Sequence, residues 1–377
     1  MNILIDGHFL DGRKHGVANF IERLYAENIL IEPKNNFYFL LGKNSKIESE
    51  IFKYPNVKVL KSIFGGSFRF IFDIPFYAIR IKADIIHTQY VLPLFRLKNS
   101  KYHITIHDVL YEDFPDLFSF RYRIIRHFIF GWSAKNADLI STISNYSKNR
   151  ILKHYNPRNT EIHIIKNGAN IPELDVDTLN CKINIPSSPY ILYVSRFEHR
   201  KNHVRLLDAF ICILKNNPGI KLVLVGFDVD GTKGNISRII VENNISNCVI
   251  ILSGISDNYI SNLIFNASLV VYPSLCEGFG MPIIESLLLN SKTIFSNRTA
   301  MAEFSFAKNN MFDPYSVQEI TQKIEEVLVG DRDNESEWTE QKNIIATEYS
   351  WVSSAKILSK IHSNLFCLNP AVECFRP

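Results

Sequence analysis

Residues 273 to 285 have the sequence Pro-Ser-Leu-Cys-Glu-Gly-Phe-Gly-Met-Pro-Ile-Ile-Glu and follow an apolar run from Ala267 to Tyr272. Such a run, rich in valine and leucine, is typical of a strand buried in a parallel sheet. Pro282 suits the first position of a helix, because the N–H group that it lacks would have no intrahelical partner there. The sequence therefore predicts a strand, a loop that carries Glu277, and a helix with Glu285 in its first turn.

The loop between this strand and this helix is suited to a ligand. The start of a helix presents unpaired N–H groups, and Gly278 and Gly280 allow a ligand to approach the main chain closely. Phe279 and Met281 complete the loop before the helix. We expect a bound group that is anionic or rich in hydroxyls. The alternative is an ordinary strand-to-helix turn whose glutamates interact favourably with the helix dipole.

Length and composition limit the classes of protein to consider. At 377 residues the chain exceeds one typical core, which favours two domains. With 46% apolar and 21% charged residues it is an ordinary globular protein, and a net charge of +4 does not indicate a nucleic-acid binder. The six cysteines include no Cys-x-x-Cys pair, which argues against a zinc site or a disulfide framework.

Neither a secretion signal nor a membrane span is expected from the sequence. The stretch from Met1 to Asp6 enters a strand-like run directly, without a basic segment followed by an apolar one. An uninterrupted apolar run of about 18 residues, as a spanning helix needs, is not found. These patterns predict a cytoplasmic protein.

Strand-like runs alternate with helical patterns along the whole chain, and this alternation is typical of parallel sheets covered by helices. The pattern restarts near Tyr190, after a stretch rich in turn-forming residues. We therefore expect an α/β protein with two doubly wound, Rossmann-like domains that face each other across a cleft. The predicted organisation is an N-terminal domain over 1–170, a linker over 171–188, a second domain over 189–350, and a terminal helix and tail over 351–377.

A second motif, Tyr193-Val-Ser-Arg-Phe-Glu-His-Arg-Lys-Asn202, follows an apolar strand and precedes a helix. It predicts that Arg196 and Lys201 meet at the end of the strand. A guanidinium fork and an ammonium group suit a diphosphate, on which charge-assisted hydrogen bonds are strong. The alternative is a solvated basic loop. Arg200 is interpreted as a spare, solvent-exposed cation.

The first domain contains weaker candidates. Gly16, at the start of a predicted helix, is expected either to let backbone amides approach a ligand or to be a plain loop glycine. His107 ends the run from Ile104 and is expected at the mouth of the cleft, with a turn-capping role beside Asp108 as the alternative. His87 is a second strand-end histidine with the same two interpretations.

The stretch from Glu277 to Glu285, with seven residues between the two glutamates, resembles the signature of the retaining nucleotide-sugar glycosyltransferases of family 4. The interior Gly-Phe-Gly-Met-Pro is similar to that family as well, and so is the spacing of Arg196 and Lys201. This resemblance implies the two-lobed GT-B fold, with a last helix that crosses back to the first lobe.

The same resemblance implies roles for individual residues. Arg196 and Lys201 would bind the donor diphosphate, together with the amides at the helix start near Pro282. Glu277 would hold the sugar with the loop amides of Phe279 and Gly280, Glu285 would bind the ribose, and His107 would contact the transferred sugar.

The implied activity is retaining transfer of a hexose, with mannose favoured, from a nucleoside-diphosphate sugar to a saccharide acceptor. A lipid-linked acceptor in polysaccharide or O-antigen biosynthesis is expected. The reaction is expected to need neither a metal nor another cofactor. Two alternatives remain open. One is a nucleotide-sugar epimerase of the same architecture, and the other is a non-catalytic scaffold subunit.

The stretch from Phe120 to Lys135 predicts an amphipathic helix with aliphatic and aromatic residues on one face and arginines on the other. One interpretation is peripheral contact with an anionic membrane at its inner face, which a second aromatic and basic stretch over Phe64 to Lys82 favours. The preferred interpretation is a helix whose apolar face packs on the sheet and whose basic face is solvated.

Overall fold

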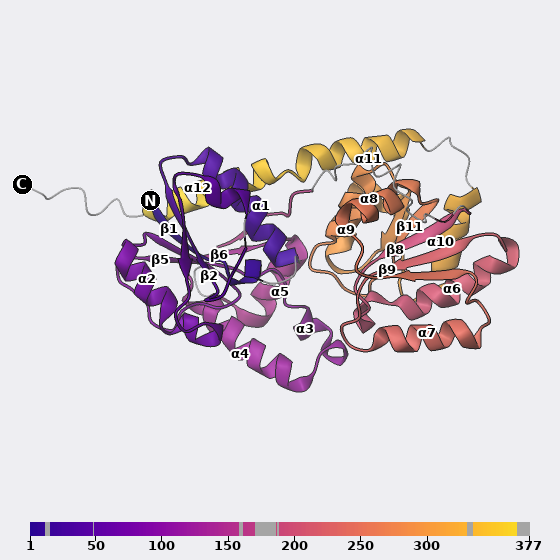
Figure 1. The fold of residues 1–377 in the computed structure, drawn as a ribbon, viewed down its shortest axis with the longest axis horizontal. Helices are drawn as coiled ribbons and strands as arrows, with labels where there is room; N and C mark the ends of the chain where they lie inside the picture. Colours follow the sequence, from indigo (N-terminus) through magenta and orange to yellow (C-terminus); the bar gives the residue numbers. More distant parts are fainter. Residues whose placement is uncertain are drawn as a thin grey trace, which may run out of the picture. The chain divides into compact units, whose positions relative to one another are not determined.

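The computed structural model describes residues 1–11, 16–47, 49–157, 161–169, 186, 188–329 and 335–367. It divides into two compact units, one formed by residues 1–168 with the stretch from Tyr349 onward, and one formed by residues 169–348 (Figure 1). Each unit is built on its own parallel sheet, which confirms the predicted α/β class with two doubly wound sheets. Nearly all of the predicted linker, and the tail beyond 367, lie outside the described residues.

The first unit contains a seven-stranded parallel sheet in the order β3-β2-β1-β4-β5-β6-β7. Its strands are β1 (Asn2–Asp6), β2 (Asn36–Leu41), β3 (Val57–Lys61), β4 (Ile85–Gln89), β5 (Lys101–Thr105), β6 (Leu139–Thr142) and β7 (Ile162–Ile164). The longer helices are α1 (Gly16–Ile31), α2 (Asp73–Ile81), α4 (Phe120–Asn136), α5 (Asn145–Tyr155) and α12 (Trp351–Cys367), and the short ones are η1 (His8–Asp11), η2 (Glu50–Lys53), η3 (Gly66–Phe70), α3 (Leu110–Asp113) and η4 (Pro115–Leu117).

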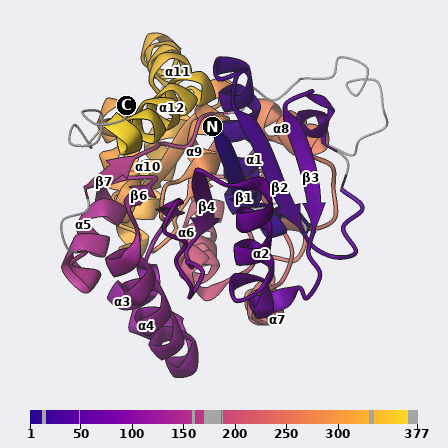
Figure 2. The same ribbon diagram turned by 90° about the vertical axis from the view of Figure 1, so that its left-hand side faces the viewer.

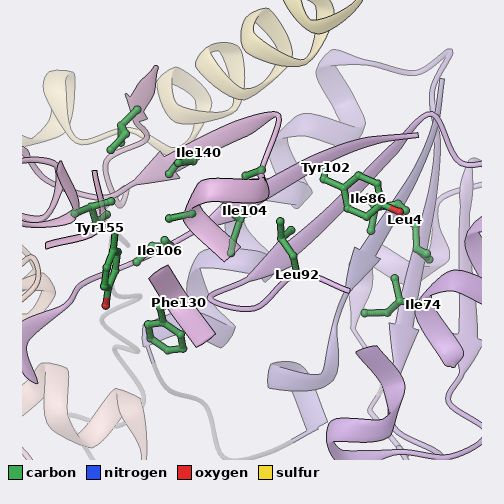
Figure 3. Close-up of a cluster of buried hydrophobic side chains, with 14 of the residues drawn as sticks. Leu4, Ile74, Ile86, Leu92, Tyr102, Ile104, Ile106, Phe130, Ile140 and Tyr155 are labelled. Atoms are coloured by element: carbon green, nitrogen blue, oxygen red, sulfur yellow. The ribbon is translucent and has the colours of Figure 1, made fainter. Parts of the chain in front are cut away.

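A hydrophobic core lies against one face of this sheet. Strand residues Leu4, Ile86 and Ile104 pack with Ile74 from α2 and Phe130 from α4 (Figure 3). All five side chains are almost completely buried. Full burial of a side chain of this size contributes about 1.5–3 kcal/mol to folding, so this cluster is a main source of the stability of the unit.

The second unit contains a six-stranded parallel sheet in the order β10-β9-β8-β11-β12-β13. Its strands are β8 (Tyr190–Val194), β9 (Lys221–Val225), β10 (Val249–Leu252), β11 (Leu269–Tyr272), β12 (Thr293–Ser296) and β13 (Met311–Phe312). The helices are η6 (His199–Lys201), α6 (His203–Asn216), α7 (Thr232–Glu242), α8 (Asp257–Asn266), α9 (Met281–Leu288), η7 (Thr299–Glu303), η8 (Ser305–Asn310), α10 (Val317–Val329) and α11 (Glu335–Glu348).

Strand β8 is the first of this sheet in the sequence but lies in its interior. The chain continues from β8 to β9 on one side and later returns to β11 on the other side. The loops that follow β8 and β11 therefore diverge from neighbouring strand ends. Ligands of open α/β sheets bind at such a switch point.

The C-terminal helix α12 belongs to the first unit and packs along α1. The amide of Asn28 donates to the carbonyl of Ala355 at 3.3 Å, and the hydroxyl of Ser354 donates to the carbonyl of Lys166 at 2.6 Å. A side chain at Gly168 would come within 2.5 Å of the backbone nitrogen of Trp351. The chain thus leaves the first unit and returns to it at adjacent points, and only glycine permits this close approach.

Helix α4 contradicts the preferred interpretation of its amphipathic pattern. The residues predicted to pack on the sheet are exposed, with exposed fractions of 57% for Ile125 and 69% for Phe128. Arg123 and Arg126, predicted to be solvated, are partly buried, and Arg126 lies over the ring of Phe130. Figure 2 shows α4 projecting beyond the strands of its unit. The periodic pattern identified two faces but did not determine which one points inward.

Candidate active site

The candidate site lies in the second unit, at the neighbouring carboxyl ends of β8 and β11. The loops after these strands are joined, since the backbone N–H of Leu275 donates to the carbonyl of Arg200 at 2.9 Å. The buried amide of Asn202 donates to the carbonyl of Pro273 at 3.0 Å, and the hydroxyl of Tyr193 donates to the carbonyl of Lys201 at 2.8 Å. These bonds fix the η6 turn against the loop that carries Glu277.

Glu277 is held between two cations. The Lys201 ammonium lies 2.5 Å from Oε1 of Glu277, and the Arg200 guanidinium lies 2.9 Å from Oε2. Arg200 also donates to the carbonyl of Cys276 at 3.1 Å. The side chains of Lys201, Arg200 and Glu277 are only 12%, 15% and 18% exposed, so solvent screens this cluster little.

A second carboxylate extends the cluster to Arg196. Glu198 accepts a hydrogen bond from Arg200 at 2.8 Å with one oxygen, and its other oxygen forms an ion pair with Nε of Arg196 at 2.6 Å. Arg196 is more exposed than the other cations, at 44%. Three cations and two carboxylates leave the cluster with an excess of one positive charge. We call these five residues the ion-pair cluster; they are Arg196, Glu198, Arg200, Lys201 and Glu277.

The cluster shifts the pKa values of its members in different directions. Burial would raise the pKa of Glu277, but Lys201 and Arg200 outweigh burial and lower it to about 2. Burial lowers the pKa of Lys201 and Arg200 lowers it further, while Glu277 opposes both. Burial would also lower the pKa of Arg200, but Glu277 and Glu198 raise it. Glu277 is therefore a carboxylate at neutral pH, and the charge of Lys201 depends on this carboxylate.

Helix α9 starts next to the cluster, directly after the loop of Glu277. Its N-cap residue is Gly280, so no side chain caps the amides of the first turn. Gly280 has a φ of +109°, and an added Cβ would lie 3.1 Å from the ring of Phe304. Both the conformation and the space therefore require glycine at this position. Phe279 is buried, with its ring 5.9 Å from that of Phe304.

The structure corrects three expectations about the two motifs. Arg200 is not a solvated spare cation but a central member of the ion-pair cluster. Glu285 is not in the first turn of the helix, because α9 begins at Met281 and Glu285 is its fifth residue. Arg196 and Lys201 do not contact each other directly, since Glu198, Arg200 and Glu277 connect them. The sequence analysis missed the role of Glu198, although this carboxylate lies between the basic residues of the motif.

The candidates of the first unit lie in different environments. His107 is buried and lies two residues beyond the end of β5, so the strand does not extend to it as predicted. His87 is inside β4 rather than at its end and is completely buried. Gly16 is exposed at the start of α1, and an added Cβ would meet nothing within 4 Å. A larger side chain would therefore fit at position 16 without a steric clash.

The chain matches the models of two protein families. The family described as glycosyl transferases group 1 matches residues 176–344, and that described as Glycosyltransferase Family 4 matches residues 43–172. The chain belongs to the family 4 glycosyltransferases. This glycosyltransferase has the GT-B fold, as does sucrose-phosphate synthase from Thermosynechococcus elongatus, with a TM-score of 0.78 and 18% identity over 97% of this chain and 99% of the other.

Two curated relatives are bacterial mannosyltransferases. The O-antigen chain mannosyltransferase RfbU of Salmonella typhimurium is 29% identical over 57% of this glycosyltransferase and 56% of its own length. The serotype-specific mannosyltransferase WbdA of Escherichia coli is 25% identical over 61% of this chain and 28% of its own length. The glycosyltransferase thus spans about half of RfbU and less of WbdA. Among its described helices, none has the length and apolar character needed to cross a membrane.

Proposed function

We propose that the chain transfers a hexose from a nucleoside-diphosphate sugar to a saccharide acceptor with retention of the anomeric configuration. The observation that carries this proposal is the ion-pair cluster, which combines an excess positive charge with the start of helix α9 at a topological switch point. A diphosphate complements both features, because it accepts charge-assisted bonds and interacts favourably with the helix dipole.

In this proposal Lys201 and Arg196 bind the diphosphate directly. Arg200 does not bind it but adds its positive charge to the site. An ammonium group has three donors, and the bond of Lys201 to Glu277 uses one of them. The backbone N–H groups of Gly278 to Met281 approach the nucleotide sugar from the side of α9. Glu285 binds the ribose hydroxyls, for which a carboxylate with two acceptor oxygens is suited.

Glu277 has two roles in the proposal. Its charge sets the position and the protonation of Lys201, and its carboxylate holds the sugar together with the amides of Phe279 and Gly280. During transfer the bond between the anomeric carbon and the leaving phosphate oxygen breaks, and a bond to the acceptor oxygen forms on the same face. The acceptor proton moves to the leaving phosphate oxygen. The cations stabilise the negative charge that grows on the diphosphate.

Mannose as the transferred sugar, and a lipid-linked acceptor in O-antigen or other polysaccharide synthesis, are the finer part of the proposal. RfbU and WbdA are both mannosyltransferases, and RfbU acts on an O-antigen chain, which supports mannose as the sugar and O-antigen as the polymer. A panel of nucleotide sugars, with GDP-mannose first, tests binding by thermal shift and transfer by product analysis. A stabilised chain that forms an α-linked product supports the proposal. An epimerised nucleotide sugar without acceptor would establish the epimerase alternative, and the lack of any binding would favour a scaffold.

Transfer is expected to proceed without a metal, because the excess positive charge of the cluster and the start of helix α9 together supply the stabilisation that a metal would otherwise provide. Treatment with excess EDTA should leave the initial rate of transfer within about twofold of the untreated rate. Addition of Mg²⁺ or Mn²⁺ to the chelated protein serves as the control. A rate that collapses with EDTA and returns with one of these ions contradicts this expectation.

We also propose that helix α4 contacts an anionic membrane from the cytoplasmic side. Large apolar residues are exposed along it, and the helix contains three arginines and one lysine but neither aspartate nor glutamate. Burial of such side chains in the interface and attraction of the arginines to anionic lipids would act together. The exposed apolar side chains of α4 are Phe120, Tyr122, Ile124, Ile125, Phe128, Ile129 and Trp132.

The double variant Ile125→Asp/Phe128→Asp should bind vesicles of phosphatidylglycerol at least about tenfold more weakly than the wild type, because each apolar side chain loses about 1.5–3 kcal/mol of burial. Vesicle co-sedimentation measures this. Val241→Asp on α7 is a matched control, since Val241 is 65% exposed and lies in the second unit. Equal binding by the double variant and the wild type would show that α4 does not touch the bilayer.

A further inference from the structure

A chain of hydrogen bonds runs through the interior of the first unit. His87 contacts the Tyr25 hydroxyl at 2.6 Å through Nδ1 and the Thr105 hydroxyl at 2.8 Å through Nε2. The hydroxyls of Thr105 and Ser141 are 2.7 Å apart. His103 contacts Ser141 at 2.8 Å through Nε2. It contacts Nε2 of His362 at 2.9 Å through Nδ1. This buried chain connects α1, three central strands and the C-terminal helix α12.

The histidines of the buried chain are neutral at neutral pH. Burial lowers the pKa of His87 and of His103 well below the ordinary value, and neighbouring histidines lower both further. Burial lowers the pKa of His362 to about 3. Each neutral imidazole has one donor and one acceptor nitrogen, so the tautomer of one ring constrains its neighbours along the chain.

Gln89 connects this chain to His107. Its Oε1 lies 2.8 Å from Nε2 of His107, and its Nε2 lies 3.5 Å from Nε2 of His87. Gln89 is the last residue of β4 and is 1% exposed. His107 is further restricted by the ring of Phe20, whose centroid is 4.8 Å away, and by that of Tyr90 at 5.4 Å.

We assign the protons of the network from the orientation of Gln89 and from the requirement that each neutral ring has one donor and one acceptor nitrogen. With its carbonyl oxygen toward His107, Gln89 accepts a hydrogen bond from the Nε2–H group of that ring and donates a hydrogen bond to Nε2 of His87. Nε2 of His87 is then an acceptor for both Gln89 and Thr105, and its Nδ1 donates to Tyr25. The same direction continues with Ser141 donating to Thr105, His103 to Ser141, and His362 to His103. Every ring in this assignment keeps one donor and one acceptor.

We propose that Gln89 is a positioning residue that fixes His107 as its Nε2–H tautomer by linking it to the buried hydrogen-bond chain. The assignment of the tautomer does not depend on the proposed function. Its role in catalysis rests on the proposed function, in which His107 contacts the transferred sugar. A ring held in one tautomer and one orientation presents the same nitrogen to the substrate at every turnover. Gln89 itself does not touch the substrate in this proposal.

Nitrogen NMR of the histidine rings tests the proposal without any turnover. The uniformly ¹⁵N-labelled wild type should show the Nε2–H pattern for His107, whose signals are identified by their loss in His107→Asn. Gln89→Met, which is similar in shape but cannot form either hydrogen bond, should give a mixture of both tautomers. Gln89→Glu, which keeps an acceptor next to His107, should retain the Nε2–H form. An Nδ1–H ring in the wild type, or an unchanged tautomer in Gln89→Met, would overturn the proposal.

The kinetic consequence separates positioning from a general loss of structure. Gln89→Met should lower kcat about 10- to 100-fold, with the KM for the donor changed by less than about threefold, because misplacement of a reacting group affects mainly the chemical step. Gln89→Glu should restore most of this loss. An unchanged kcat in Gln89→Met would show that the position of His107 does not affect catalysis. If the wild type itself transfers no sugar, the proposed function is wrong, but the NMR test of the tautomer of His107 still applies.

Thr88→Val provides a matched control on the same strand. Thr88 is completely buried, and its hydroxyl has no hydrogen-bond partner among the described residues. Successive side chains of a strand point to opposite faces, so this substitution changes β4 without reaching His107. The variant should keep both the Nε2–H tautomer of His107 and the wild-type kcat. A tautomer mixture in Thr88→Val would show that any disturbance of β4 suffices, and would overturn the role of Gln89.

Discussion

Replacement of Lys201 by alanine is expected to reduce sugar transfer by about 100- to 1,000-fold, the usual effect of removing one donor that stabilises transition-state charge. Lys201 is the buried cation closest to Glu277, and the proposal places its remaining donors on the departing diphosphate. Arg200 would still neutralise Glu277, so the variant should fold, with a stability loss of about 1–3 kcal/mol. Initial rates with the active nucleotide sugar measure the effect.

Lys323→Ala is the matched control for this variant. Lys323 lies in the same unit and forms an ion pair of 2.7 Å with Glu326. The partner carboxylate is 66% exposed, and such surface pairs contribute about 0–1 kcal/mol. We expect wild-type rates from Lys323→Ala. If the Lys201→Ala protein is folded by circular dichroism and transfers sugar at the wild-type rate, Lys201 does not bind the diphosphate.

Replacement of Arg200 by methionine should produce the largest loss of stability in the second unit. Arg200 is the one residue that contacts both carboxylates of the ion-pair cluster, so its loss leaves Glu198 and Glu277 with a single cation each. Removal of one member of a buried ion pair costs about 3–5 kcal/mol. Urea denaturation at neutral pH measures this difference. The double variant Arg200→Met/Glu277→Gln should recover part of the loss, because it removes a carboxylate that has lost a partner.

The stability of the wild type should also fall in acid because of Glu277. Its pKa is about 2 in the folded chain, below the ordinary value of 4.5. The unfolded state therefore binds the proton first, and the contribution of Glu277 is present above pH 4.5 and is lost as the pH falls toward 2. Glu277→Gln should be less stable than the wild type at pH 7, and the two proteins should converge only as the pH falls to about 2. An equal stability difference at both pH values would contradict the lowered pKa.

Most of the fold was predictable because its strands are short and apolar. The run over Leu269–Tyr272 is fully buried, as its composition predicts, and the turn and helix that follow contain the expected glycine and proline. The two-residue strand β13 was not predicted, since Met311 and Phe312 are too short a run to show a period. The apolar face of α4 was assigned the wrong direction, because a period of 3.6 residues shows that two faces differ but not which neighbour either face meets.

The site was predictable to the extent that it depends on local sequence. Glu277 and Lys201 were selected from their motifs, and the structure brings them together across neighbouring loops. The burial of Arg200 depends on the loop after β11, which is more than 70 residues away in the chain, and local sequence does not contain that information. The connection between Gln89 and His107 was missed for the same reason, since it requires two strands in register.

The position of α12 has a consequence for biosynthesis. Ala355 and Leu358 of α12 are completely buried in the first unit. The rest of this unit, apart from the stretch from Tyr349 onward, is formed by residues 1–168. During translation, all strands of this unit emerge from the ribosome well before the helix that covers α1, while the whole second unit is synthesised in between. We therefore expect the second unit to reach its native state first, and the first unit to remain incomplete until α12 has emerged from the ribosome.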